Sequence, residues 1–315
     1  MGKIRIGVSS CLLGENVRYD GGNKRDIYIT DTLGKYFEWV PVCPEVEYGL
    51  PVPREAMHLV GSPDSPRLVT VRTGTDHTKG MQGWNSKKLK ELEREGLCGF
   101  IFKSRSPSSG IGGVKIYTPA GIPHKTGAGI FGGAFIKNFP LTPVIDDGRL
   151  NDPKLRENFI ERIFVYKRCK DNLHSGVAVS ALVNFHTDHK LLVLSHSPEH
   201  LRALGRLVAD ARQYKTSVLL KRYIIILTEG LKLLSTVRKN TNVLMHIMGY
   251  FKKHLSSDEK QELLEVIDNY HKGYVPLIVP MVLINHYVRK FDEPYLKKQV
   301  YLNPHPAELM LRNHV

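Results

Sequence analysis

The segment at residues 4–14 reads IRIGVSSCLLG and decides the fold class of the first half of the chain. Its first residues have the β-rich composition of a strand, and a loop of small residues with one cysteine follows. The same order returns in VPVCPEVE at residues 40–47 and in KSRSPSSG at residues 103–110, which continue strand-like runs at residues 37–42 and 99–103. Strands that end in such loops and alternate with helical segments are typical of an α/β sheet.

The character of the sequence changes near residue 150. Beyond it Gly and Pro become rarer, and apolar residues recur at helical spacing from Leu155 to Tyr166. We therefore predict two domains: a Rossmann-like α/β domain with a mostly parallel sheet over residues 1–150, and an all-α domain over residues 151–315. Individual helices are predicted at residues 85–95, 154–170, 197–213, 217–248, 257–270 and 276–291.

The chain carries a formal net charge of +14, and the excess lies mainly in the second half. Residues 1–150 hold 20 Lys and Arg against 15 Asp and Glu, whereas residues 151–315 hold 25 against 16, which gives +5 and +9. This excess favours a polyanionic partner, because each neutralised phosphate releases counterions; a basic surface without such a partner is the alternative. No stretch reaches the roughly 18 consecutive apolar residues of a membrane helix, and residues 1–5 do not resemble a signal peptide. We therefore expect a cytoplasmic protein with no membrane partner.

The four cysteines are too few and too scattered for a disulfide framework, so metal and catalytic roles come first. Cys11 and Cys43 lie in loops that follow strands, and in a parallel sheet such loops meet at the carboxyl ends of the strands, where ligands bind. We expect these two cysteines and Ser109 of the third loop to form one site, although a single such cysteine would more often be a small buried hydrophobe. Cys98 precedes its strand and Cys169 lies within a predicted helix, so both are interpreted as structural.

The three loops belong to longer motifs. SSCLLG is followed by RYDG at residues 18–21, CPE at residues 43–45 is followed by GLPVPR at residues 49–54, and TGTDHT occupies residues 73–78. Together with SPSSG in the third loop, these motifs closely resemble the thiouracil desulfidase family over residues 3–150.

The second half resembles an α-helical domain that is often fused to this desulfidase domain, through NFHTDHK at residues 184–190, HS at residues 196–197 and LG at residues 204–205. Fused proteins of this kind look like desulfidases that act on 4-thiouridine in tRNA and give uridine, so the resemblance implies a tRNA partner. Two alternatives stay open: a desulfidase of free 2-thiouracil-type bases, which lone desulfidase domains resemble, and a non-enzymatic RNA-binding protein with a decayed site. These motifs predict no oligomeric state.

The resemblance implies a [4Fe–4S] cluster and no dinucleotide cofactor. The family holds the cluster through three cysteines, and Cys11 and Cys43 match two of them. The third family loop reads SPSCG, whereas this chain has Ser109 at the cysteine position. An introduced substitution, a natural variant with a weakened cluster and replacement by Cys98 are three explanations, and the first is favoured because the surrounding residues match the active pattern. In the family, the iron that lacks a cysteine ligand accepts the sulfur as sulfide, without net redox change.

The resemblance also implies roles for individual side chains. Glu45 corresponds to a catalytic glutamate that would act as the general base, and a surface or N-cap carboxylate is the alternative. Ser106 corresponds to a serine thought to assist proton transfer or to orient the base, and a turn hydroxyl is the alternative. Charged residues of the same motifs are candidates for contacts with the base edge or with flanking phosphates: Arg18, Asp20, Arg54, Lys103 and Arg105.

Candidates for RNA contact in the second half are basic residues and histidines of the predicted helices: Lys167, Arg168, His186, His189, Lys190 and Arg222. His186 and His189 also fit a metal site together with His196, since residues at i and i+3 share a helix face. No cysteine or carboxylate set with zinc spacing accompanies them in the sequence, so a basic surface that faces RNA is the favoured interpretation. A solvated helix face is the alternative.

Overall fold

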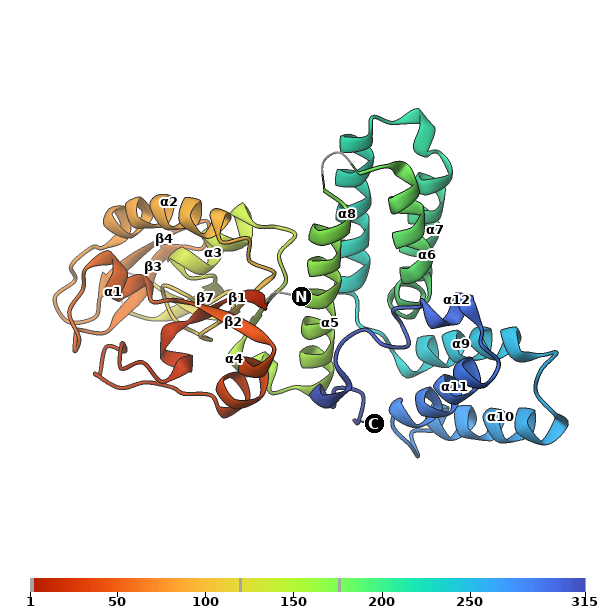
Figure 1. Cartoon of the computed structure of the whole chain (residues 1–315). Coiled ribbons are helices and arrows are strands. Elements are labelled where there is room, and N and C mark those ends of the chain that lie inside the picture. The colour runs from red at the N-terminus through yellow and green to blue at the C-terminus, as the bar shows by residue number, and fades with distance from the viewer. Residues whose placement is uncertain (1–2, 119–120, 175–176, 315) are drawn as a thin grey trace. The chain divides into compact units, whose positions relative to one another are not determined.

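Contacts within the chain divide it into two units, Met1–Asp152 and Pro153–Val315 (Figure 1). The structure, a computed structural model, describes residues 3–118, 121–174 and 177–314, without the side chains of residues 124 and 125. None of the helices in these ranges combines the length and the hydropathy that a membrane span requires.

The first unit contains two four-stranded sheets (Figure 1). In the first sheet all neighbouring strands are parallel, which confirms the predicted α/β class, and their order is β2 (Phe37–Val42), β1 (Ile4–Ser9), β5 (Gly99–Phe102) and β8 (Val144–Asp146). The second sheet is mixed and was not predicted; its order is β4 (Ser65–Thr70), β3 (Met57–Ser62), β6 (Val114–Tyr117) and β7 (Pro123–Gly127). The helices of the unit are α1 (Pro44–Tyr48), α2 (Thr78–Arg94), α3 (Ile130–Asn138) and α4 (Asp147–Leu150).

The strand order of the parallel sheet creates a crevice at its carboxyl edge. The chain leaves β1 toward β2 on one side and later returns to β5 on the other side of β1, so the connections diverge between β1 and β5. Ligands of open α/β sheets bind at such a switch point. Gly7 in β1 leaves room for the ring of Phe100 in β5, since a Cβ atom there would lie 2.1 Å from that ring.

Helices α2 and α3 contribute to the apolar core of the first unit. Phe131 and Phe135 of α3 pack with Phe100 and Phe102 of β5 and with residues of α2. Helix α2 begins seven residues before the predicted start at residue 85. Glycines at its start obscured the pattern. A Cβ at Gly80 would lie 2.2 Å from the hydroxyl of Tyr48, so the Tyr48 side chain would have to shift.

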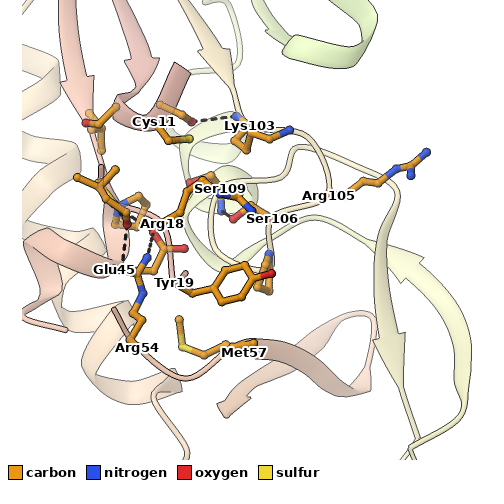
Figure 2. Close-up of a pocket in the computed structure, with 18 of the residues that line it drawn as sticks. Cys11, Arg18, Tyr19, Glu45, Arg54, Met57, Lys103, Arg105, Ser106 and Ser109 are labelled. Atoms are coloured by element: carbon orange, nitrogen blue, oxygen red, sulfur yellow. Dashed lines mark hydrogen bonds and ion pairs between the residues drawn. The ribbon is translucent and has the colours of Figure 1, made fainter. Parts of the chain in front are cut away.

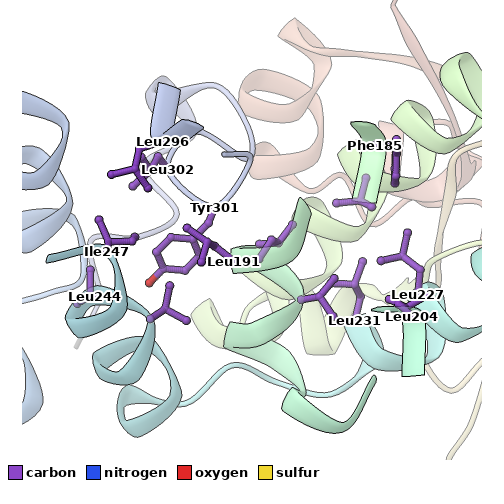
Figure 3. Packing of buried hydrophobic residues seen from close by; sticks show 14 of the residues in the cluster. Phe185, Leu191, Leu204, Leu227, Leu231, Leu244, Ile247, Leu296, Tyr301 and Leu302 are labelled. Carbon is purple, nitrogen blue, oxygen red and sulfur yellow. The ribbon is translucent and has the colours of Figure 1, made fainter. Parts of the chain in front are cut away.

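The second unit is helical, as predicted, and its apolar core is shown in Figure 3. Its helices are α5 (Pro153–Asn172), α6 (Val179–His196), α7 (Pro198–Ala209), α8 (Thr216–Lys232), α9 (Val237–Met248), α10 (Ser257–His271), α11 (Ile278–Lys290) and α12 (Pro294–Lys297). The single helix predicted at residues 217–248 was wrong. The chain is extended at Leu233, and Thr236 starts α9 as an N-cap whose side chain accepts a hydrogen bond from the backbone N–H of Lys239.

Candidate functional site

A cavity of about 370 Å³ lies among the loops that follow β1, β2 and β5 (Figure 2). Cys11 follows β1, Cys43 follows β2 and precedes α1, and Ser109 belongs to the loop after β5; all three line this cavity. The structure thus brings together the three positions that the sequence places in separate loops. Cys98 and Cys169 are buried elsewhere and do not line the cavity.

The two cysteines of the cavity are free thiols. Cys11 is 9% exposed and Cys43 is 8% exposed. Burial raises the pKa of Cys11 to about 11 and the pKa of Cys43 to about 12. A metal ion or cluster that uses these sulfurs as ligands must therefore displace two protons.

Glu45 receives hydrogen bonds from both walls of the cavity. Its Oε1 accepts from the hydroxyl of Ser108, and its Oε2 lies 3.5 Å from the thiol sulfur of Cys43. A guanidinium nitrogen of Arg54 lies 3.8 Å from Oε2, and the Arg54 side chain is only 7% exposed. The Glu45 side chain is therefore held in one orientation at the first turn of α1.

A chain of serine hydroxyls leads to this carboxylate. Ser106 Oγ lies 2.9 Å from Ser108 Oγ and also accepts from the backbone N–H of Ser109 at 3.1 Å. Since the one hydroxyl proton of Ser108 is donated to Glu45 Oε1, Ser106 must donate to Ser108. The three groups form a directed relay from Ser106 to Glu45. Ser108 was not among the predicted site residues, although it lies in the same motif and is fully buried.

The first turn of α3 forms backbone hydrogen bonds with the loop at residues 106–110, called the serine loop here. The backbone N–H of Ile130 donates to the carbonyl of Pro107 at 3.1 Å, and that of Phe131 donates to the carbonyl of Ser108 at 2.8 Å. Gly132 is required for this approach, because a Cβ there would lie 2.5 Å from the carbonyl oxygen of Gly110. The backbone around Ser109 is therefore fixed by hydrogen bonds of the protein itself.

Two arginines of the predicted set line the cavity near Glu45. Arg54 donates to the carbonyl of Val17 at 3.0 Å, and Arg18 forms an ion pair with Asp20 at 3.3 Å. Asp20 itself is exposed and does not line the cavity, so its predicted contact with the substrate is not supported. Asp20 instead pairs with the guanidinium of Arg18. Hydrogen bonds from Gly22 and Arg18 lower the pKa of Asp20.

Lys103 and Arg105 line the cavity from the loop after β5, but they differ in surroundings. The amine of Lys103 lies 2.7 Å from the carboxylate of Asp147, which sequence reasoning missed because α4 lies more than 40 residues later. Burial alone would raise the pKa of Asp147, but hydrogen bonds from Lys103 and Ser104 lower it. Arg105 is exposed and has a φ of 57°, an uncommon conformation for a residue with a side chain.

In the second unit, His186 and His189 were wrongly assigned to an RNA-facing surface. They are 8% and 3% exposed, because His186 Nδ1 lies 3.1 Å from the hydroxyl of Tyr223 and His189 stacks on the ring of Phe185. Burial lowers the pKa of His186 to about 4 and that of His189 to about 3. Both are therefore neutral core residues.

The four basic candidates of the second unit have partners within it. Lys167 pairs with Asp171 at 2.5 Å, and the guanidinium of Arg168 donates to the carbonyl of Pro304 at 2.7 Å. Arg168 is half-buried, and burial lowers its pKa. The other two cations lie over aromatic rings: Lys190 over Tyr295 at 5.3 Å and Arg222 over Tyr214 at 5.1 Å. Of the four, Arg222 is exposed and the other three are partly buried.

A second cavity, of about 430 Å³, lies within the second unit beside a buried network of charges. Glu161 Oε1 lies 2.6 Å from His196 Nε2, and Glu161 Oε2 lies 3.3 Å from a guanidinium nitrogen of Arg312. Arg312 also lies 3.3 Å from Glu157 and donates to the carbonyl of Tyr301 at 2.7 Å. No sequence motif predicts this network, because its members are up to 155 residues apart.

Comparison with known proteins follows the division into two units. Residues 6–147 match the family model described as 2-thiouracil desulfurase, and residues 190–306 match the model of a protein of unknown function, DUF1722. The uncharacterized protein YbgA of Escherichia coli (strain K12) is 31% identical over 169 residues, which cover 52% of this chain and 98% of that protein. A solved structure described as the [4Fe-4S]-dependent thiouracil desulfidase TudS is 29% identical, with a TM-score of 0.40, and the match covers 48% of this chain and 95% of that chain.

Proposed function

Because the chain belongs to the family of E. coli YbgA and its first unit carries the 2-thiouracil desulfurase domain, we propose that it removes sulfur from a thiolated uracil. The observation that supports this most directly is the cavity at the carboxyl edge of the parallel sheet. It places two buried thiols beside a carboxylate that is aligned by a serine relay. These groups fit the exchange of C=S for C=O, in which water adds its oxygen and hydrosulfide leaves.

An iron–sulfur cluster is part of the proposal. Cys11 and Cys43 match two of three thiolate ligands, whereas Ser109 offers a hydroxyl, a harder and less acidic donor. Among the described residues no group of three or more His, Cys, Asp and Glu side chains could hold a metal ion, so the donor set is short of one thiolate. A cluster held by Cys11 and Cys43, with Ser109 at the third position, would supply a Lewis-acidic iron that accepts the sulfur.

The side chains of the cavity would then orient the base and handle its protons. Glu45 takes a proton from the attacking water, because its Oε2 lies in the cavity 3.5 Å from the thiol of Cys43. Ser106 and Ser108 keep its second oxygen aligned and connect it to the serine loop. Arg18, Arg54 and Lys103 can donate to the oxygen and ring edge of the uracil.

We further propose 4-thiouridine in tRNA as the substrate and uridine as the product. The charge of +9 in residues 151–315 supports this proposal, since a free base requires no second basic domain. Family membership of the first unit supports a free 2-thiouracil-type base equally well, so this remains the second candidate. A decayed, non-enzymatic RNA-binding site is less well supported, because Glu45 and Ser106 are both retained and both lie at the cavity.

Anaerobic reconstitution of the parent chain and of Ser109→Cys tests the proposal. Iron and sulfide are counted in both proteins, and sulfur loss is measured from thiolated tRNA and from free 2-thiouracil. We expect Ser109→Cys to hold more iron and to turn over faster, since a third thiolate completes the ligand set. Ser62→Cys, which adds a thiol at the exposed end of β3, is the matched control. No sulfur loss from either substrate by a fully loaded Ser109→Cys protein would refute the proposed activity.

A further inference from the structure

A groove of about 490 Å³ adjoins the cavity on the side of the second sheet. Met57, Arg105 and Pro107 line both, so the groove begins where the cavity ends. Its other walls include His58 of β3 and Lys115 and Tyr117 of β6. Figure 2 shows Met57 at the rim of the cavity and the guanidinium of Arg105 pointing away from Cys11.

The groove offers an aromatic surface of the kind on which nucleobases stack. The rings of His58 and Tyr117 are stacked, with centroids 5.0 Å apart and an interplanar angle of 27°. Both side chains are partly exposed. A base that lies against this pair gains stacking energy whatever its identity, because every base has a π-face.

The groove is also electropositive. Arg105 and Lys115 are exposed, and no carboxylate of the described residues forms an ion pair with either. None of the described residues that line the groove is acidic. A phosphate that enters the groove therefore meets two cations with no competing anion on its walls, and the planar fork of Arg105 suits phosphate oxygens.

We propose that this groove binds the nucleotide next to the thiolated one in a polynucleotide strand. The thiolated uracil occupies the cavity, the neighbouring base stacks on His58 and Tyr117, and the linking phosphate lies between Arg105 and Lys115. The inference rests on the proposed function and makes it more specific: the substrate class is an oligonucleotide, because a free base fills the cavity and leaves the groove unused.

Binding of a labelled, unreactive uridine pentanucleotide to the full chain tests the groove. Tyr117→Ala removes a stacking surface and should weaken binding about 5- to 150-fold, the range that corresponds to the loss of one base stack. Lys115→Ala, an exposed substitution with little effect on folding, should weaken binding at low salt and reduce the slope of log K against log salt by about 0.7. Lys87→Ala on the exposed face of α2 is the matched control, since it lines neither the cavity nor the groove.

Desulfidation measured in parallel separates the groove from the proposed function. The groove predicts that Tyr117→Ala and Lys115→Ala lower kcat/KM for a 4-thiouridine pentanucleotide more than for free 4-thiouracil. If the parent and both variants bind the pentanucleotide equally well, or if Lys87→Ala weakens binding as much as they do, the groove does not bind a neighbouring nucleotide, even if the parent removes sulfur. The opposite result is also informative. If both variants bind the pentanucleotide more weakly but the parent removes no sulfur from either substrate, the groove is supported as a nucleotide-binding site and the proposed activity is overturned.

Discussion

Replacement of Glu161 by Gln tests how much the buried charge network stabilises the second unit. The side chains of Glu161, His196 and Arg312 are 4%, 2% and 5% exposed, so they rely mainly on one another and on backbone groups for polar partners. His196 Nδ1 lies 2.6 Å from the carbonyl of Leu233 and its Nε2 faces Glu161, so both ring nitrogens point to acceptors. The carboxylate thus serves two donors, one on each oxygen.

The amide of Gln keeps one acceptor oxygen and places an N–H group opposite the other donor. Either His196 or Arg312 then loses its partner, and breaking one side of a buried ion pair costs about 3–5 kcal/mol. We take about 3 kcal/mol, because Arg312 keeps Glu157 and the carbonyl of Tyr301. For a unit of this size, that loss corresponds to a fall in Tm of roughly 6–12 °C.

Two probes on the full chain assign the effect to the second unit. Both tryptophans, Trp39 and Trp84, lie in residues 1–152, whereas far-UV circular dichroism is dominated by the helical unit. We expect Glu161→Gln to shift the circular dichroism transition and to leave the tryptophan transition in place. Glu199→Gln, an exposed substitution in α7, is the control. A shift no larger than that of the control would show that the network contributes little.

The pH dependence supplies an independent check of the same network. Burial alone would raise the pKa of Glu161, but His196 and Arg312 lower it to about 2, below its ordinary value of 4.5. The stabilisation is therefore fully present above about pH 4.5 and is lost as the pH falls toward 2. The difference between parent and Glu161→Gln should shrink over this range, and a constant difference would contradict the assignment.

Three further outcomes are expected. Glu45→Gln should lower kcat for sulfur removal about 10²- to 10⁴-fold without changing iron content, and near-full activity would exclude Glu45 as the base. Burial raises the pKa of Glu157 in the folded protein to about 7, so the parent loses stability as the pH rises from 4.5 through 7. Glu157→Gln cannot titrate at this position and should therefore gain stability relative to the parent over this interval, by up to ~3 kcal/mol. Gly132→Ala should destabilise the first unit by about 1–3 kcal/mol, since its Cβ would meet the carbonyl of Gly110. The midpoint of unfolding in urea, followed by tryptophan fluorescence, measures this loss. An unchanged midpoint would contradict the close approach.

The parallel sheet and the meeting of its three loops could be predicted because both depend on local pattern. Each of the three strands is a short apolar run, and whatever follows such strands reaches the same edge of the sheet. The second sheet could not be predicted in the same way. Its strands β3 and β6 pair across more than 50 residues, and the pairing depends on packing against α2 rather than on composition.

The wrong predictions for the second unit have a different physical origin. The spacing of His186 and His189 shows that they share a helix side, but it cannot show which side faces the core. Their burial follows from contacts with Tyr223 and Phe185. Similarly, Leu233 and Leu234 favour a continuous helix locally, whereas the fold ends α8 at Lys232 and uses Thr236 to begin another.

The connection from Arg312 to the two glutamates of α5 sets an order for the synthesis of the protein. Arg312 follows Glu157 by 155 residues and Glu161 by 151. At translation rates of about 5–20 residues per second, the ribosome needs roughly 8–30 s between these positions. During that interval α5 carries carboxylates whose guanidinium partner has not been made. The second unit can therefore close its charge network only after nearly all of its helices have been translated, and a ribosome stalled in this interval would present an unfinished bundle to chaperones and proteases.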